Sequence, residues 1–179
     1  MPDFNHVEEV KTILGYGARK NLWMVRFGLP NVLAAAAELE NQIELLAKNA
    51  ILPGTRTIEP IQMVYKGETW SLAGEKGTYD AELKIVFDNP QNFAQRNIFE
   101  LWENIIQQDM TSLRTSPSVY KSSNFFVTHL GNDLEPTRKF KFGGVYPTKV
   151  NHIELSATEG GLMETTVNFM FDVFELIPV

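Results

Sequence analysis

Apolar and polar residues alternate with a period of two over several stretches of the chain, as they do in half-buried β-strands. The clearest case is residues 79–88, where every second residue from Tyr79 to Phe87 is apolar and the residues between them are mostly polar. The same alternation predicts strands over 22–27, 124–130, 137–142, 152–157 and 164–176. Glycine-rich turns between the later strands favour antiparallel pairing. One face of the last strand would carry Val167, Phe169, Phe171 and Val173.

Apolar residues at spacings of three and four predict that residues 90–109 form one amphipathic helix. Asn89 can cap its start, and Pro90 can occupy the first helical position, where no N–H is needed. Gln95 falls on the polar side of this helix. The apolar side, which we expect to pack against the strands, consists of Ile98, Trp102, Ile105, Ile106 and Met110.

Residues 31–50 fit two secondary structures. The alanine run at 34–37 favours a helix by propensity, whereas Ile43, Leu45 and Ala47 alternate with polar residues as in a strand. The pattern leaves this choice open. Many strands and one long helix, at about residues 90–109, predict a mainly β (α+β) fold with antiparallel strands.

Length and composition narrow the class of protein. A chain of 179 residues can bury roughly 70% of its surface, so we expect a single domain over residues 1–179. The net charge of −6 argues against a surface that binds nucleic acid through its phosphates. Because the sequence has no cysteine, disulfides, thiolate metal sites and a cysteine nucleophile are excluded.

Nothing in the sequence predicts a membrane anchor. The longest stretches without a charged residue, 27–37 and 122–132, are much shorter than the ~20 residues of a membrane helix. The first residues lack the basic start and apolar run of a signal peptide. We therefore expect synthesis in the cytoplasm.

The chain holds few candidates for catalysis or metal binding. His6, His129 and His152 are scattered, without the spacing of a metal site. His152 and Glu154 fall on one face of a predicted strand and could form an acid–base pair, but an exposed pair of neighbours is the commoner arrangement. The residues therefore predict no catalytic, cofactor or metal site.

Two further groups of side chains admit a binding role. Asp80, Glu82 and Asp88 share a predicted strand face and could hold a cation, although Lys84 among them favours a solvated or interfacial face. Four phenylalanines could stack nucleic-acid bases, but the acidic balance favours a core or subunit contact. They are Phe125, Phe126, Phe140 and Phe142.

Four sequence blocks, at 19–25, 47–79, 87–102 and 144–175, resemble those of a known family in order and spacing. The first has the pattern Arg-x-Asn-Leu-aromatic, and the second contains Leu-Pro-Gly and Ala-Gly-Glu-Lys-Gly turns. The third leads from Phe87-Asp88-Asn89 into the helix with Trp102. The fourth joins a Tyr-Pro-Thr strand to the C-terminal strand. Over residues 19–176 the chain resembles the tail tube proteins of contractile-tailed bacteriophages, which are akin to type VI secretion and other injection-system tube proteins.

The resemblance implies an antiparallel β-barrel or sandwich with one flanking helix, and it implies a virion structural protein. Six copies would form a ring, and rings would stack into the inner tube of a contractile tail, a conduit for DNA during ejection. The partners would be further copies of the chain, the tail sheath and the baseplate, and DNA would pass without specific binding. The tail would be assembled in the host bacterial cytoplasm, and no catalytic residue or cofactor is implied. The resemblance also favours a strand over 42–50 and marks residues 28–41 as an insertion.

Other functions stay open at this point. A baseplate tube-initiator protein would share the fold but form only one ring, and the tube subunit of an injection system would also share it. A small β-barrel ligand-binding protein or hydrolase would need a polar pocket with a strongly perturbed titrating group. For a tube, we expect an acidic or neutral lumen, because Lys and Arg contacts to phosphate would hold the DNA.

Residues 66–78 are the candidate contact between subunits. Three glycines, Gly67, Gly74 and Gly77, predict a mobile loop, and this loop carries the isolated Trp70. Tryptophan is enriched among residues that dominate interface energy, and the resemblance places this region against the adjacent ring. Trp70 would be buried either there or in the core of its own domain. The residues that we assign to the inter-subunit contact are Lys66, Glu68, Trp70, Glu75 and Lys76.

Overall fold

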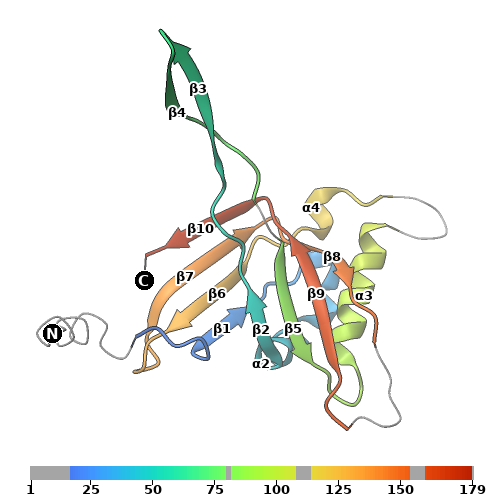
Figure 1. Ribbon diagram of the computed structural model, residues 1–179. Coiled ribbons are helices and arrows are strands. Elements are labelled where there is room, and N and C mark those ends of the chain that lie inside the picture. Colours follow the sequence, from blue (N-terminus) through green and yellow to red (C-terminus); the bar gives the residue numbers. More distant parts are fainter. Residues whose placement is uncertain (1–16, 80–81, 108–113, 154–159, 179) are drawn as a thin grey trace, which may run out of the picture.

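The computed structural model describes residues 17–79, 82–107, 114–153 and 160–178, which form two four-stranded sheets and a separate hairpin (Figure 1). Sheet I has the order β1 (Trp23–Arg26), β6 (Phe125–Leu130), β7 (Pro136–Gly143) and β10 (Val173–Ile177). Sheet II has the order β2 (Ala47–Ile51), β5 (Leu83–Asp88), β9 (Glu164–Met170) and β8 (Tyr146–Val150). All neighbouring strands in both sheets are antiparallel.

Sheets I and II pack face to face through aromatic side chains. Phe27, which follows β1, contacts Phe125 of sheet I and both Phe87 and Phe169 of sheet II, with ring centroids 4.5 to 6.0 Å apart. The alternation predicted over 79–88 is confirmed for 83–88, where Leu83, Ile85 and Phe87 of β5 are fully buried, whereas residues 79 and 82 are not in the strand and 80–81 lie outside the described residues. Both sheets keep their own edges among the described strands. The mainly β prediction is therefore confirmed as an open sandwich, and the barrel alternative is not.

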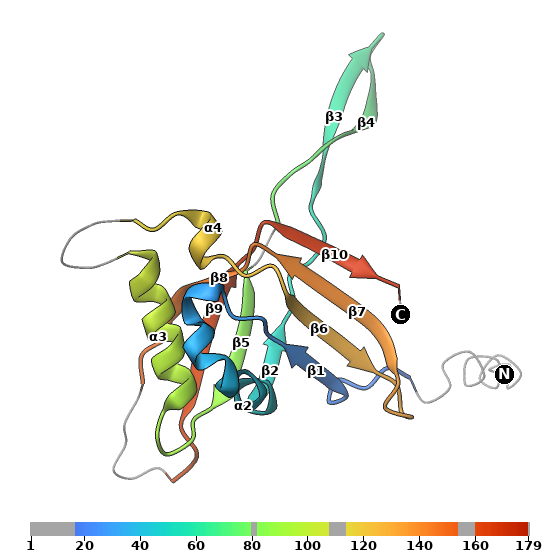
Figure 2. The ribbon, with the colours of Figure 1, turned by 180° about the vertical axis from the view of Figure 1, so that it is seen from behind.

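The long helix, α3 (Ala94–Ile106), packs on the same face of sheet II as sheet I. Its Phe99 contacts Phe87 and Phe169, with ring centroids 5.1 and 5.6 Å apart. Trp102 is fully buried, and its indole Nε1–H donates to the Tyr120 carbonyl oxygen at 2.7 Å. Figure 2 shows α2 (Glu40–Leu45) and α4 (Pro117–Tyr120) on the same side as α3. On the predicted apolar side of the helix, Ile98 and Trp102 are buried, and Ile105 and Ile106 are half-buried. Met110, the fifth residue predicted there, lies outside the described residues.

The predicted start of α3 is wrong by four residues. Residues 90–93 form a turn in which the Phe93 N–H donates to the Pro90 carbonyl oxygen, and Phe93 has a φ of +52°. Asn89 is therefore not the cap. Its carboxamide oxygen accepts hydrogen bonds from Gln95 and Thr165 instead, and this contact buries Gln95, which we had placed on the polar side.

Residues 31–50 contain both a helical and a strand segment. A 3-10 segment, η1 (Asn31–Leu39), and α2 precede strand β2, so the predicted strand over 42–50 is wrong for 42–46. Tertiary contacts hold α2 in place. Ile43 is buried in the core, and the carboxylate of Glu44 accepts the Phe27 N–H at 2.8 Å.

The predicted strand over 164–176 is two strands in different sheets. β9 ends at Met170, and the chain crosses to sheet I, where β10 begins at Val173. The Asp172 N–H donates to the Gly143 carbonyl oxygen at this crossing. Val167, Phe169 and Phe171 are buried as expected, but Val173 is 45% exposed because the crossing changes which face it occupies.

The other strand predictions vary in outcome. The predictions over 22–27, 124–130 and 137–142 correspond to β1, β6 and β7. The strand predicted over 152–157 lies mostly outside the described residues, and residues 152–153 are not in a strand. The strand in this part of the chain is β8, whose alternation is broken by a register shift between Pro147 and Lys149.

Candidate assembly surface

Strands β3 (Ile58–Tyr65) and β4 (Glu68–Lys76) form an antiparallel hairpin that projects away from both sheets (Figure 1). β3 follows β2 and β4 precedes β5, so the hairpin is inserted between two paired strands of sheet II. The loop predicted over 66–78 is therefore wrong, because residues 68–76 are a strand.

The glycines of this segment shape the hairpin. Lys66 and Gly67 join the strands with φ values of +50° and +83°, as a two-residue hairpin turn with two left-handed positions requires. At Gly74, a Cβ atom would lie 2.2 Å from the Glu59 carbonyl oxygen, beside the shift of register between the strands. The glycines thus serve the turn and the close approach of two backbones.

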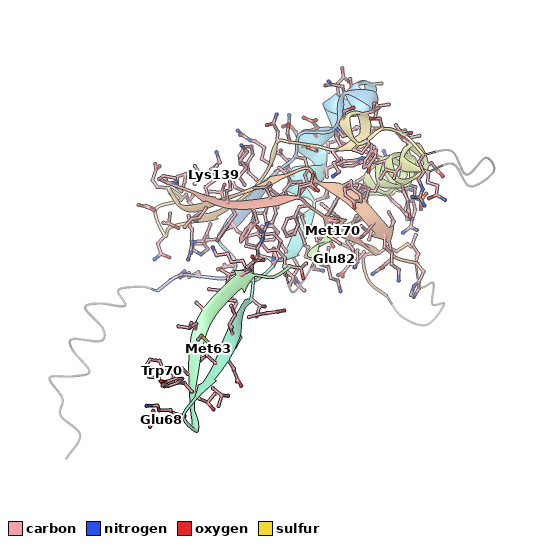
Figure 3. All side chains as sticks on the ribbon, turned by 90° about the horizontal axis from the view of Figure 1, so that it is seen from above. Met63, Glu68, Trp70, Glu82, Lys139 and Met170 are labelled. Carbon is pink, nitrogen blue, oxygen red and sulfur yellow. The ribbon has the colours of Figure 1, made fainter. Side chains whose placement is uncertain are left out.

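One face of the hairpin is apolar and exposed. Ile61 lies opposite Leu72 and Met63 opposite Trp70, and directly opposed residues project from the same face. Figure 3 shows Met63, Glu68 and Trp70 on the hairpin, away from the sheets. We call this surface the hairpin face: Ile61, Met63, Tyr65, Glu68, Trp70 and Leu72. Its apolar side chains are 51% to 67% exposed.

The opposite face of the hairpin is mostly polar. Gln62, Thr69 and Ser71 lie on it with Val64, which is 73% exposed. Sequence reasoning missed four members of the hairpin face, and the signal was present as a period of two over 61–65 and 68–72. The four are Ile61, Met63, Tyr65 and Leu72.

The structure gathers the five assigned contact residues on the hairpin. Lys66 lies in the turn, Glu68 and Trp70 lie on the hairpin face, and Glu75 and Lys76 lie at the end of β4 near its root. Trp70 is 62% exposed, so burial in its own core is ruled out. An isolated two-stranded hairpin is marginally stable in water. An exposed apolar face on such a hairpin therefore points to cover by another chain.

The candidates for chemistry do not form a site among the described residues. Asp80 and Glu154 lie outside them. Glu82 accepts a hydrogen bond from the Asn168 amide at 2.9 Å, and Asp88 lies 3.5 Å from the Lys48 ammonium. Within the described part of the chain, no three His, Asp or Glu side chains are grouped to hold a metal ion.

Of the four phenylalanines considered for base stacking, two are core residues. Phe125 and Phe142 are fully buried and contact each other edge to face. Phe126 and Phe140 are half-buried, and the Lys139 ammonium lies 4.4 Å from the Phe126 ring centroid. The core interpretation is therefore confirmed for Phe125 and Phe142.

Ion pairs tie strands of sheet II and the sheet crossing together. Lys48 donates to Glu164 at 2.5 Å, and this hydrogen bond, with nearby Asp88, raises the pKa of Lys48. Lys121 donates to Asp172 at 2.8 Å, which raises the pKa of Lys121. Burial raises the pKa of Glu44 although it accepts the Phe27 N–H. These contacts join neighbouring elements of the fold.

The described helices include none that is both long and apolar enough to cross a bilayer.

The sequence profile of the family described as "Phage tail tube protein" matches residues 18–176. The match covers nearly the whole chain, and the chain belongs to this family. Members are structural proteins of the tail tube and not enzymes, so the hydrolase alternative is excluded. The comparison with curated proteins gives no match.

Solved structures with the same fold come from contractile injection systems. A chain of the sheath–tube complex of the extracellular contractile injection system PVC, in its extended state, superposes with a TM-score of 0.63 at 12% identity, covering 95% of this chain and 97% of that one. A chain of the PVC sheath/tube terminator gives 0.66 at 13%, covering 92% and 99%. A chain of the tube-terminating cap of the anti-feeding prophage gives 0.65 at 14%, covering 92% and 93%. At these identities the likeness concerns the fold.

Proposed function

We propose that six copies of this chain form a ring and that the rings stack into the inner tube of a contractile tail. The observation that carries the proposal is the hairpin face, an apolar surface on a projecting hairpin that its own domain leaves uncovered. Lys66, Glu68, Trp70, Glu75 and Lys76 belong to the contact between rings. A contact between two different surfaces, repeated by each copy, generates an open and growing assembly.

The edges of the two sheets support ring formation. β1 and β10 are the edge strands of sheet I, and β2 and β8 are those of sheet II. Exposed edges present unpaired N–H and C=O groups that invite pairing with another chain. Joining these edges around a ring removes them, as closure does in a barrel.

The tail sheath and the baseplate are the proposed partners of the tube, and the virion tail is its place. Similar folds occur in a sheath–tube complex and in a baseplate of injection systems, the latter with a TM-score of 0.55 at 13% identity over 89% of this chain. The tail is assembled in the cytoplasm of the host bacterium. A second candidate is a protein that forms a single ring at one end of the tube, because the same fold occurs in a tube terminator and a tube-terminating cap.

Electron microscopy of the purified protein separates these proposals. Stacked six-fold rings of indefinite length are the expected result for a tube subunit. Single rings at all concentrations would favour a terminator or initiator instead. A protein that stays monomeric up to high concentration would contradict both.

The outer face of sheet II suits the wall of a DNA channel. It carries three cations and three anions, with Lys48 paired to Asp88 and Glu164, so its charge is balanced. The residues are Lys48, Lys84, Lys149, Glu82, Asp88 and Glu164. Assembled tubes are therefore expected not to retain duplex DNA at physiological salt, because no excess of Lys or Arg faces its phosphates. Co-sedimentation of tubes with labelled duplex DNA measures this, and salt-sensitive retention would contradict a neutral wall.

A further inference from the structure

An apolar groove runs along the inner face of sheet I, beside strand β2. The part near β1 is a cleft of about 250 Å³ lined by Trp23, Leu52 and Phe140 among others. The part near β10 is a cleft of about 520 Å³ lined by Phe140, Phe174 and Leu176 among others. Because Phe140 lines both clefts, they are neighbouring parts of one surface. We call this surface the flank groove.

The flank groove is a part of the sandwich core that sheet II does not cover. Val25, Val127, Phe140 and Leu176 occupy one row across the four strands of sheet I. The two residues at the β1 end of this row are 3% exposed, whereas Leu176 at the β10 end is 55% exposed. Sheet II therefore covers only one side of this inner face, and the described residues of a single copy leave an apolar strip exposed.

The charged residues of the groove are all of one sign. The ionised side chains that line its two parts are Lys20, Arg56, Lys76 and Arg138, and no carboxylate of the described residues lines either part. On a chain with a net charge of −6, this is a local concentration of positive charge. The hairpin face carries the carboxylate of Glu68, two residues from Trp70 on the same strand, and the ammonium of the turn residue Lys66 lies 5.4 Å from the ring centroid of Tyr65.

We propose that the flank groove receives the hairpin face of a second copy, with Trp70 inserted in the cleft beside Phe140 and Glu68 next to Lys20. Both surfaces carry apolar side chains that the described residues of one copy leave exposed, and the carboxylate of Glu68 is opposite in charge to the cations of the groove. A large aromatic side chain seated in a pocket at the centre of an interface is the usual form of a binding hot spot. The inference rests on the proposed assembly into a tube and names the surface that accepts the hairpin.

Cross-linking between two single-cysteine variants tests the inference directly, because the native chain has no cysteine. Met63→Cys places one thiol on the hairpin face beside Trp70 and keeps the indole, and Asn49→Cys places the other on an exposed position that lines the groove. The two variants are mixed with excess parent protein, assembled, treated with a short bis-maleimide cross-linker and analysed as dimers on a denaturing gel. Lys149→Cys, on the exposed β8 edge of sheet II, is the matched control for Asn49→Cys.

The expected result is that Met63→Cys gives at least about ten times more dimer with Asn49→Cys than with Lys149→Cys. Tubes that form normally but give no dimer between Met63→Cys and Asn49→Cys would overturn the inference and leave the proposed tube intact. A dimer between Asn49→Cys and Leu101→Cys instead would show that the groove receives α3 of a second copy, which also overturns it. If the parent protein forms no assembly at all, the proposed function itself fails.

A charge exchange provides an independent readout. Glu68→Lys places like charges together and is expected to raise the protein concentration needed for tube formation by about tenfold or more. Adding Lys20→Glu to the same chain is expected to restore assembly, because each copy supplies both surfaces. Lys20 is exposed in a turn, so the change leaves the core intact. Failure of the second substitution to restore assembly would contradict the pairing of Glu68 with Lys20.

Discussion

Replacing Trp102 by alanine is expected to lower the free energy of unfolding by about 3 to 5 kcal/mol, the range for large-to-small changes in a core. The indole is fully buried between α3 and the sheets, 6.4 Å from the Phe169 ring centroid. Its N–H also donates a hydrogen bond to the carbonyl oxygen of Tyr120 at the end of α4. The substitution therefore leaves a cavity and an unpaired carbonyl together.

Urea unfolding followed by circular dichroism measures this effect on unassembled protein. Leu101→Ala is the matched control, because Leu101 is the preceding residue of the same helix and is 51% exposed. The control is expected to lose less than about 1 kcal/mol, as surface substitutions do. A loss of that size for Trp102→Ala would show that α3 does not seal the sandwich core.

Strand β5 shows what the alternation of residue types can predict. Leu83, Ile85 and Phe87 point into the core at the expected period because the face that they occupy is buried along its whole length. The burial of Trp102 was predictable for the same reason, since a helix with one apolar side must cover something. Both predictions concern residues whose surroundings are uniform along the element.

Element boundaries depended on contacts between distant residues. Gln95 was assigned to the polar side of a helix, yet its amide reaches the Asp88 carbonyl oxygen and the Asn89 side chain. Those hydrogen bonds replace a local cap at Asn89, and α3 begins later. Glu44 similarly holds α2 through the Phe27 N–H. Phe27 lies 17 residues from Glu44, and Asn89 also accepts a hydrogen bond from Thr165, 76 residues away. Neither boundary could therefore be inferred from local propensity.

The hairpin was missed because its glycines were interpreted as a sign of mobility. Gly67 and Gly74 are required by a tight turn and by a close approach of two backbones, both of which fix the chain. The alternation around Trp70 was a better guide than the glycines. The alternation of apolar and polar residues around Trp70 also indicates an apolar face. That apolar face is the part of the candidate assembly surface that could be predicted from the sequence.

Trp70→Ala is expected to abolish or strongly impair tube formation while leaving the single copy folded. Trp70 is 62% exposed, and its cross-strand neighbour is Met63. A cross-strand pair contributes about 0.2 to 1 kcal/mol, so the unfolding free energy of the unassembled protein should fall by no more than that. In the assembly, truncating a buried tryptophan at an interface typically costs about 2 kcal/mol or more. That corresponds to a rise of about 30-fold in the concentration at which tubes appear.

Light scattering against protein concentration measures the assembly, and urea unfolding measures the stability of the single copy. Val64→Ala is the matched control, because Val64 is apolar and 73% exposed but lies on the opposite face of the same hairpin. The control should assemble at nearly the parent concentration. Equal impairment by both substitutions would mean that the hairpin as a whole, and not its apolar face, makes the contact. Normal assembly of Trp70→Ala would remove Trp70 from the interface, since an anchor that can be deleted without effect carries no binding energy.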